Sequence, residues 1–245
     1  MIRAEQGEKP KGIEVIIGPH NRAEELAKQL RMDALDGLQE NPFSAYCAIA
    51  LTNTPELVKP FVRKGQDRIK GLLERASITA YDPGTAPLSP DLNLTEGPGV
   101  IYQTDLARVA SSRFFTADDT IPSTGKGVET AEARRYNRIS VIFHDNRIRT
   151  SRMQPDCTIH VGITDWDQQE NRIVEMFQML KTFEPGRGLV DGQPALLGFK
   201  DDEVVDLAKE VNETFPDLAY TFDGTKPPLK FALENHAVLF DTSEE

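Results

Sequence analysis

Short apolar runs alternate with longer amphipathic stretches along the chain. The runs with strand-like composition are bounded by turn residues and cover 13–18, 45–51, 77–82, 113–118, 139–144 and 157–164. Apolar residues at helical spacing occur at 21–39, 55–76, 100–112, 128–138, 168–183 and 201–215, and further short strands are expected at 218–222 and 236–241. This alternation predicts an α/β fold with a largely parallel sheet flanked by helices.

Proline and glycine mark the expected breaks between these elements. Asn41–Phe43 should end the first helix, and Thr54 should cap the next one, which contains Pro60. Residues 83–99 are rich in both residue types and predict a long loop with a functional role. Residues 184–194 have the composition of a linker.

Composition and charge narrow the classes of partner. No apolar run approaches the length of a membrane span, and the charged N-terminal segment MIRAEQGEKPKG lacks the pattern of a secretory signal. A cytoplasmic protein without a membrane partner is therefore expected. Lys and Arg number 28 against 39 Asp and Glu, and the formal net charge of -11 disfavours a nucleic-acid partner.

Cysteine and histidine patterns give no sign of a disulfide or a metal. Cys47 and Cys157 form no close-spaced pair and lie in apolar runs, so both are expected to be reduced and buried. The histidines are isolated in the sequence, with no HxxxH or CxxC spacing near them: His20, His144, His160 and His236. No metal site is expected.

The stretch ADDTIPSTGKGVETAEARRYNR, residues 117–138, places a loop of small residues between a predicted strand and a predicted helix. In open parallel sheets ligands bind at the carboxyl ends of strands, so this loop lies in the expected ligand crevice. Backbone N–H groups near a helix N-terminus, with the hydroxyls of Ser123 and Thr124, suit an anion such as phosphate. Gly127 follows Lys126 where a P-loop requires Ser or Thr, and no G-x-G-x-x-G supports a dinucleotide cofactor.

Glu129, at the end of this loop, has two interpretations. In the first turn of a helix it would interact favourably with the helix dipole, and that alone would explain it. Alternatively it joins Asp105, Asp118 and Asp119 in one crevice. Like charges at close range raise at least one carboxyl pKa and suit acid, base or nucleophile roles.

The segment IYQTDLARVASSRFFTADDTIPSTGKGVETAEA, residues 101–133, resembles the core signature of the nucleoside 2-deoxyribosyltransferase superfamily. The nearest branch is that of the 2′-deoxynucleoside 5′-monophosphate N-glycosidases, whose pattern is I-Y-x-x-D-L, then A-D/E, then P-S-x-G-x-G-x-E-x-x-x-A. Every element has a counterpart here, and the resemblance extends from Ala45 to about His144. The expected fold is a Rossmann-like (flavodoxin-like) core over 44–150, with α/β additions over 1–43 and 151–245.

The resemblance implies catalytic roles for three residues. Glu129 matches the glutamate that attacks the sugar C1′ or stabilises its cation. Asp105 matches the acid that positions or protonates the leaving base. Asp118 falls at the acidic position on the strand end.

The resemblance also implies a substrate-binding set. Tyr46 resembles the tyrosine that reaches the active site from the first core strand. Ser123 and the amides around Gly125 and Gly127 match the cradle for a 5′-phosphate. Asp119, beside Asp118, is expected to contact the substrate as well.

The chain departs from the family pattern at informative positions. The transferases have an acid six positions before the nucleophile, where this chain has Ser123, and this favours the phosphate-binding, hydrolytic branch. The loop after the first core strand lacks the arginine that grips phosphate. Lys126 or the Arg134/Arg135 pair would have to compensate, although Lys126 on the outside of the turn would be an ordinary solvated lysine.

These residues suit cleavage of an N-glycosidic bond. The reaction develops oxocarbenium character at C1′, so it needs an ionised carboxylate below the sugar and a second carboxyl with a raised pKa to protonate the base. No metal or organic cofactor is required. The predicted activity is hydrolysis or base exchange of a nucleoside or nucleoside 5′-monophosphate in a homodimer or higher oligomer. The alternatives are a catalytically inactive nucleotide-binding sensor on the same fold and a structural protein whose acidic face is solvated.

Overall fold

The computed structural model describes residues 12–17, 41–50, 54–85, 97–121, 123–148, 156–226, 231–232 and 237–238. The helix predicted over 21–39 and most of the loop predicted over 83–99 lie outside the described residues.

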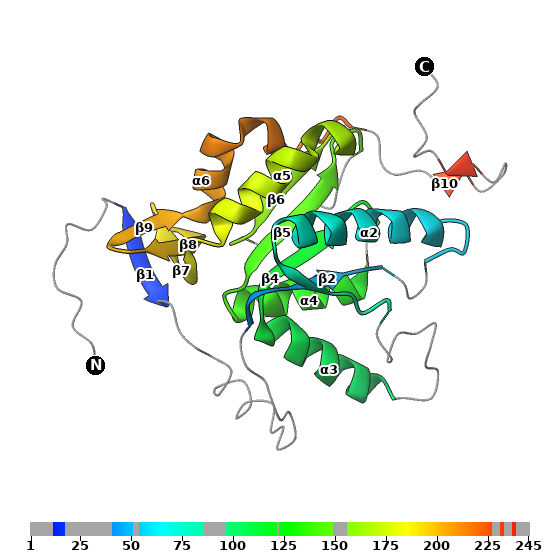
Figure 1. Ribbon diagram of the computed structural model, residues 1–245, viewed down its shortest axis with the longest axis horizontal. Helices are drawn as coiled ribbons and strands as arrows, with labels where there is room; N and C mark the ends of the chain where they lie inside the picture. Colours follow the sequence, from blue (N-terminus) through cyan, green and yellow to red (C-terminus); the bar gives the residue numbers. More distant parts are fainter. Residues whose placement is uncertain are drawn as a thin grey trace.

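A five-stranded parallel sheet forms the centre of the molecule (Figure 1). Its strands are β2 (Asn41–Ala48), β3 (Thr79–Tyr81), β4 (Ser112–Asp118), β5 (Ile139–Asp145) and β6 (Ile159–Ile163). Their order is β3-β2-β4-β5-β6, and every neighbouring pair is parallel. This is the flavodoxin-like order of doubly wound sheets, so the predicted fold class is confirmed. The chain changes direction across the sheet between β2 and β4, where ligands of such folds bind.

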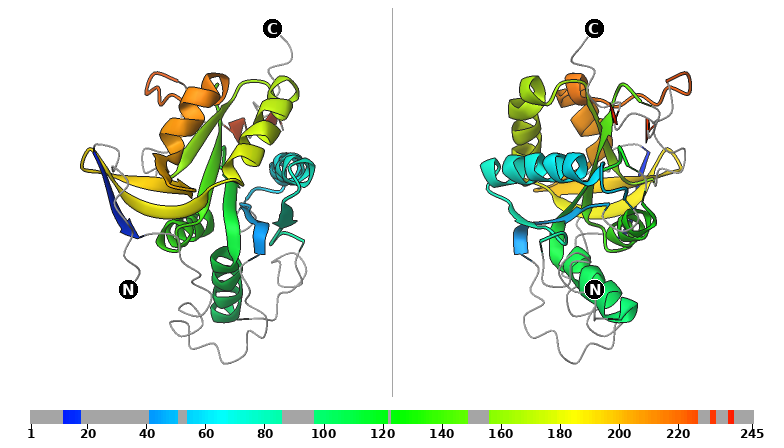
Figure 2. Two further views of the ribbon diagram at one scale, coloured as in Figure 1. Left: turned by 60° about the vertical axis from the view of Figure 1, so that its left-hand side comes forward. Right: turned by 90° about the vertical axis from the view of Figure 1, so that its right-hand side faces the viewer.

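Helices cover both faces of this sheet (Figures 1 and 2). Helices α2 (Lys59–Arg75) and α5 (Trp166–Leu180) pack on one face, and α3 (Pro98–Ser111) and α4 (Thr124–Arg135) on the other. A strand buried on both faces is apolar throughout, which is why the sheet strands could be found as continuous apolar runs. None of the helices in the described ranges is long and apolar enough to span a bilayer.

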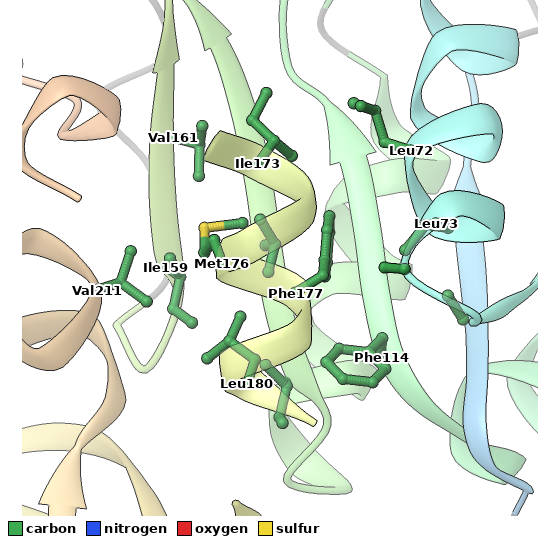
Figure 3. Packing of buried hydrophobic residues seen from close by; sticks show 14 of the residues in the cluster. Leu72, Leu73, Phe114, Ile159, Val161, Ile173, Met176, Phe177, Leu180 and Val211 are labelled. Atoms are coloured by element: carbon green, nitrogen blue, oxygen red, sulfur yellow. The ribbon is translucent and has the colours of Figure 1, made fainter. Parts of the chain in front are cut away.

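The larger core lies between the sheet and α5 (Figure 3). Ile173, Met176, Phe177 and Leu180 project from successive turns of α5 and are fully buried against the strands. Phe177 meets Phe114 of β4 edge to face, with ring centroids 5.9 Å apart. Cys47 and Cys157 are buried, and neither forms a disulfide, as predicted.

A second, antiparallel sheet lies beside the first and joins distant segments of the chain (Figure 1). Its order is β1 (Ile13–Ile17), β7 (Glu184–Val190), β8 (Gln193–Lys200) and β9 (Glu203–Asp206). The prediction of a linker over 184–194 is wrong. Asp191 and Gly192, with φ of 50° and 79°, make the two-residue turn typical of hairpins. Position 188 of β7 requires glycine, because a Cβ there would lie 2.0 Å from the Glu14 carbonyl oxygen of β1.

The remaining described elements follow the hairpins. Helix α6 (Leu207–Thr214) is followed by the 3-10 helix η1 (Pro216–Leu218), and β10 (Phe231–Ala232) pairs with β11 (Ala237–Val238). The predicted start of the helix over 201–215 is wrong because 203–206 form β9. The Asp206 carboxylate instead caps α6 by accepting from the amides of Ala208 and Lys209.

Two predicted breaks before the site also need correction. Asn41–Phe43 is not a break but the first part of β2, which begins at Asn41. Thr54 does not cap α2; its hydroxyl donates to the Ala50 carbonyl at 2.8 Å. Helix α2 starts at Lys59, so Pro60 falls in the first turn, where the missing N–H has no helical partner to lose.

Candidate active site

Helix α4 starts four residues earlier than predicted. Ser123 is its N-cap: the side-chain oxygen accepts from the Lys126 amide, and the Gly127 amide donates to the Ser123 carbonyl at 3.1 Å. Gly125 and Gly127 therefore belong to the beginning of the helix, not to a preceding loop. Glu129 lies beyond the first turn, which contains no acidic residue. The helix-dipole explanation of Glu129 consequently does not apply.

The Tyr46 hydroxyl donates a hydrogen bond to Glu129 Oε1 at 2.9 Å. Tyr46 lies on β2 and Glu129 on α4, so the bond crosses the point where the sheet changes direction. The Tyr46 side chain is fully buried. A buried hydroxyl without a partner costs about 1–3 kcal/mol, so the carboxyl is an effective anchor for it.

An aromatic row fixes the orientation of the Tyr46 ring. The strand register places Tyr81 and Phe115 directly beside Tyr46 on the two neighbouring strands. Their ring centroids stack on that of Tyr46 at 5.7 and 6.0 Å, and the Arg108 guanidinium lies 5.0 Å from the Tyr81 centroid. With the ring held on both sides, the hydroxyl can point only toward α3 and α4.

Asp105 on α3 interacts with the same tyrosine. Burial raises the pKa of Asp105, although its hydrogen bond with Tyr46 works in the opposite direction. Burial also raises the pKa of Glu129 to about 7; the Asp105 charge adds to the rise, while Tyr46 and Lys126 oppose it. Burial, the neighbouring carboxylates and the hydrogen bond raise the pKa of Tyr46, so it remains a neutral donor. Glu129 can therefore exchange a proton near neutral pH, and the pKa of Asp105 is displaced in the same direction.

Lys126 holds the turn between β4 and α4. Its side chain is only 4% exposed, and its ammonium donates to the carbonyls of Asp118 and Ile121. Burial lowers the pKa of Lys126, whereas Asp118, Asp119 and Glu129 raise it. Of the two alternatives for Lys126, that of an ordinary solvated lysine is wrong: the residue stabilises the turn and places a positive charge near Glu129.

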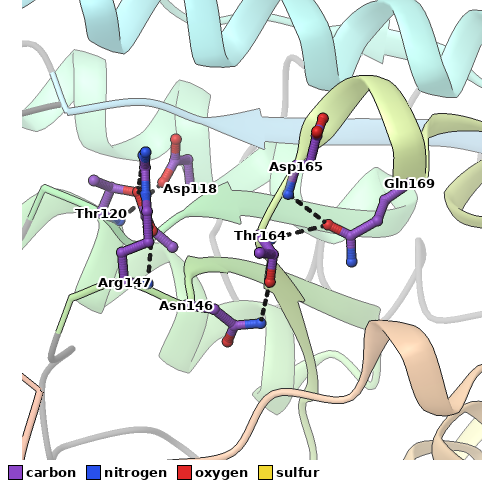
Figure 4. Close-up of polar contacts among 8 residues, drawn as sticks. Asp118, Thr120, Asn146, Arg147, Thr164, Asp165 and Gln169 are labelled. Atoms are coloured by element: carbon purple, nitrogen blue, oxygen red, sulfur yellow. Dashed lines mark hydrogen bonds and ion pairs between the residues drawn. The ribbon is translucent and has the colours of Figure 1, made fainter. Parts of the chain in front are cut away.

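The neighbouring acids Asp118 and Asp119 have different surroundings. The Asp118 carboxylate accepts a hydrogen bond from the Thr120 amide at 2.8 Å (Figure 4). It also lies against α2, since a Cβ added to Gly65 would be 2.8 Å from Asp118 Oδ2. The Asp119 carboxylate lies 3.9 Å from His144 Nδ1. Successive side chains at a strand end point to opposite faces, so the two acids cannot serve one site equally.

The buried His144 and the half-buried His160 form a pair that sequence spacing did not reveal. His144 Nε2 and His160 Nδ1 are 2.8 Å apart, and Tyr220 stacks on His144 at 4.2 Å. Burial lowers the pKa of His144 to about 3 and also lowers that of His160, so both are neutral. No group of three or more metal-ligating side chains occurs among the described residues. Their proximity could be predicted only from the pairing of β5 with β6, which the sequence does not give.

No protein-family model matches the chain, and no curated protein sequence is similar to it. Among solved structures, the CMP N-glycosidase BcmB of Clostridium botulinum superposes with a TM-score of 0.38 at 11% identity, over 53% of this chain and 97% of that chain. At this similarity neither the family nor the role of any residue follows from the match.

Proposed function

We propose that the protein cleaves the N-glycosidic bond of a nucleoside or nucleoside 5′-monophosphate, with Glu129 as nucleophile. The supporting observation is the 2.9 Å hydrogen bond from the buried Tyr46 hydroxyl to Glu129, with Asp105 on the same hydroxyl. A polar pair of this kind, buried at the ligand edge of a doubly wound sheet, is costly to maintain without a function. The family resemblance of residues 101–133 gives the same carboxyls the same roles.

In the proposed reaction, one oxygen of the Glu129 carboxylate attacks C1′ while the C1′–N bond breaks and its electron pair leaves with the base. Tyr46 holds the carboxylate in place through its donated hydrogen bond. Asp105, whose pKa burial raises, gives its proton to the departing base. A water molecule, deprotonated by the Asp105 carboxylate, then hydrolyses the glycosyl ester and restores both carboxyls.

Asp118 is a weaker candidate for the acid than Asp105. Its carboxylate is directed toward α2 and accepts from Thr120, whereas Asp105 interacts with the tyrosine that binds Glu129. Asp119 faces His144 and is proposed to contact the substrate from that side.

A 5′-phosphate would bind at the N-terminus of α4. The Gly127 amide is already bonded to the Ser123 carbonyl, and the Ser123 oxygen accepts from Lys126. The amides of the first turn, including that of Gly125, remain the proposed donors, because the first amides of a helix have no partner within it. The homodimer and the division of the chain at residues 43 and 150 remain predictions.

The direct experiment is incubation of the enzyme with deoxyribonucleosides, ribonucleosides and their 5′-monophosphates, followed by chromatography for free base. Base release from at least one member is expected. Thermal stabilisation by a nucleotide without base release, at high enzyme concentration, would favour the nucleotide-binding sensor, since a ligand that binds only the native state raises its stability. If no compound causes either base release or thermal stabilisation, both the proposed enzyme and the nucleotide-binding sensor are contradicted.

A further inference from the structure

A cavity of about 180 Å³ lies at the carboxyl edge of the sheet, on the side of α2 and α5. The residues after β2, β4 and β5 form its floor, and the N-terminal half of α2 forms its wall. Neither Tyr46 nor Glu129 lines it, although Lys126 and Asp118 do. This space is called the α2 cavity below.

The wall of the α2 cavity is one stripe of helix α2. Phe61, Lys64, Gly65 and Arg68 recur at the spacing that places residues on a single helix face. Gly65 costs a helix interior about 0.5–1 kcal/mol relative to alanine. The structure gives a reason for it, because a side chain there would collide with the Asp118 carboxylate. Gly65 therefore lets α2 lie close to the end of β4, and Lys64 and Arg68 on the same helix face line the cavity.

The charge of the cavity is opposite to that of the chain. Lys64, Arg68, Lys126 and Arg147 line it, against the carboxylates of Asp118 and Asp145, in a chain of net charge -11. Asp145 is already held by Arg147, with contacts of 2.6 to 3.1 Å, and Asp118 accepts from Thr120 (Figure 4). Arg68 also lies 3.4 Å from Asp167, an exposed residue outside the lining. The four cationic side chains of the lining outnumber its two carboxylates, and an excess of one sign of charge attracts small ions of the opposite sign.

The aromatic residues in the lining of the α2 cavity and the volume of this cavity indicate which uncharged part of a ligand would fit. Phe61 is 44% exposed, and Trp166 at the start of α5 packs on Phe143 with centroids 5.6 Å apart while also lining the cavity. The volume is below the roughly 300–1,000 Å³ of sites for whole cofactors. It is comparable to the roughly 150 Å³ apolar cavity that accommodates a benzene ring.

We propose that the α2 cavity is a second binding site, for a single-ring aromatic anion such as a ring carrying a carboxylate or phosphate. The ring would lie against Trp166 and Phe61, and its anionic group would face Lys64 and Arg68. The site does not depend on cleavage at Glu129, so it stands or falls separately from the proposed enzymatic function.

Trp166 provides the measurement, because it is the one tryptophan of the chain. The probe is phenyl phosphate, which has the ring and the charge but no glycosidic bond. Titration should change the Trp166 emission saturably, and neutral benzyl alcohol should bind roughly tenfold more weakly or worse. Inorganic phosphate, which lacks the ring, should also bind more weakly. Equal binding of either control compound, or no saturable change at millimolar phenyl phosphate, would overturn the proposal.

Matched variants locate the binding. Lys64→Glu places a negative charge at the cavity on an exposed helix position, and it should weaken phenyl phosphate binding by roughly tenfold. Arg63→Glu makes the same change one residue away, outside the lining, and should have a much smaller effect. Glu129→Gln should leave the titration unchanged. Equal loss in the two α2 variants, or loss of binding in Glu129→Gln, would contradict a separate site in the α2 cavity.

Discussion

The two sides of the carboxyl edge of the sheet differ in chemistry. On the side of α3 and α4, Glu129 and Asp105 gather around the buried Tyr46 hydroxyl. On the side of α2 and α5, cationic side chains such as Lys64 and Arg68 outnumber the carboxylates in the lining of a small cavity. The first arrangement can exchange protons near neutral pH, whereas the second can attract an anion. One strand end thus serves two environments, because alternate residues of a strand face opposite ways.

Lys126 belongs to both environments, so its removal should have the largest effect on stability. In Lys126→Met the carbonyls of Asp118 and Ile121 lose a buried donor, and we expect a loss of roughly 2–4 kcal/mol in the free energy of unfolding. Urea denaturation measures it. Lys64→Met is the matched control: that exposed lysine should change stability by no more than about 0.5 kcal/mol. Similar losses in the two variants would contradict the role given to Lys126.

Glu129 should reduce stability above neutral pH. Its pKa is raised from 4.5 to about 7 in the folded protein, so ionisation costs the folded state more than the unfolded state. This penalty is absent below the unfolded pKa and complete above the folded one. Glu129→Gln should therefore stabilise the protein by roughly 1–3 kcal/mol above pH 7, and the gain should vanish below about pH 4.5. Melting curves across pH test it; a gain independent of pH would be the contrary result.

Tyr46→Phe tests the site of Tyr46, Glu129 and Asp105 separately from the α2 cavity. The ring stays stacked between Tyr81 and Phe115, but the hydrogen bond that lowers the Glu129 pKa is lost. We expect kcat to fall roughly tenfold or more and the acid limb of the pH–rate profile to move to higher pH. Phenyl phosphate binding should not change. Tyr81→Phe, in the same aromatic row, is the control, and an equal shift of its profile would count against the Tyr46 contact.

Ser123 should give the smallest effect. Ser123→Ala removes the cap of α4 and should cost about 0.5–2 kcal/mol in thermal unfolding, whereas Ser123→Asn keeps a capping oxygen and should remain near the wild-type value. Comparison of substrate affinity in the two variants separates capping from phosphate binding. Equal stability of both variants would show that the cap contributes little.

The strands of the parallel sheet could be predicted because burial on both faces makes them apolar runs. Of the antiparallel strands, β1 was predicted as an apolar run over 13–18, but β7, β8 and β9 were not. Gly186 and Gly188 make β7 resemble a linker until its close approach to β1 is known. Glu129, Asp105 and Tyr46 could be named from the sequence pattern. The role of Lys126 could not, because the predicted start of α4 was four residues too late and left that lysine in a loop. The separation of Asp118 from Asp119 also required the strand register.

Base release by Glu129→Gln, at about pH 8 where the wild-type carboxylate is ionised, tests the central claim most directly. The substitution keeps an oxygen that can accept from Tyr46 but removes the negative charge that stabilises positive character at C1′. We predict a fall in kcat of roughly 10²–10³ with little change in nucleotide affinity, because the charge acts mainly in the transition state. Glu132→Gln, three residues further along α4, should retain wild-type turnover. Base release by Glu129→Gln within about twofold of the wild-type rate would contradict the assignment of Glu129 as nucleophile.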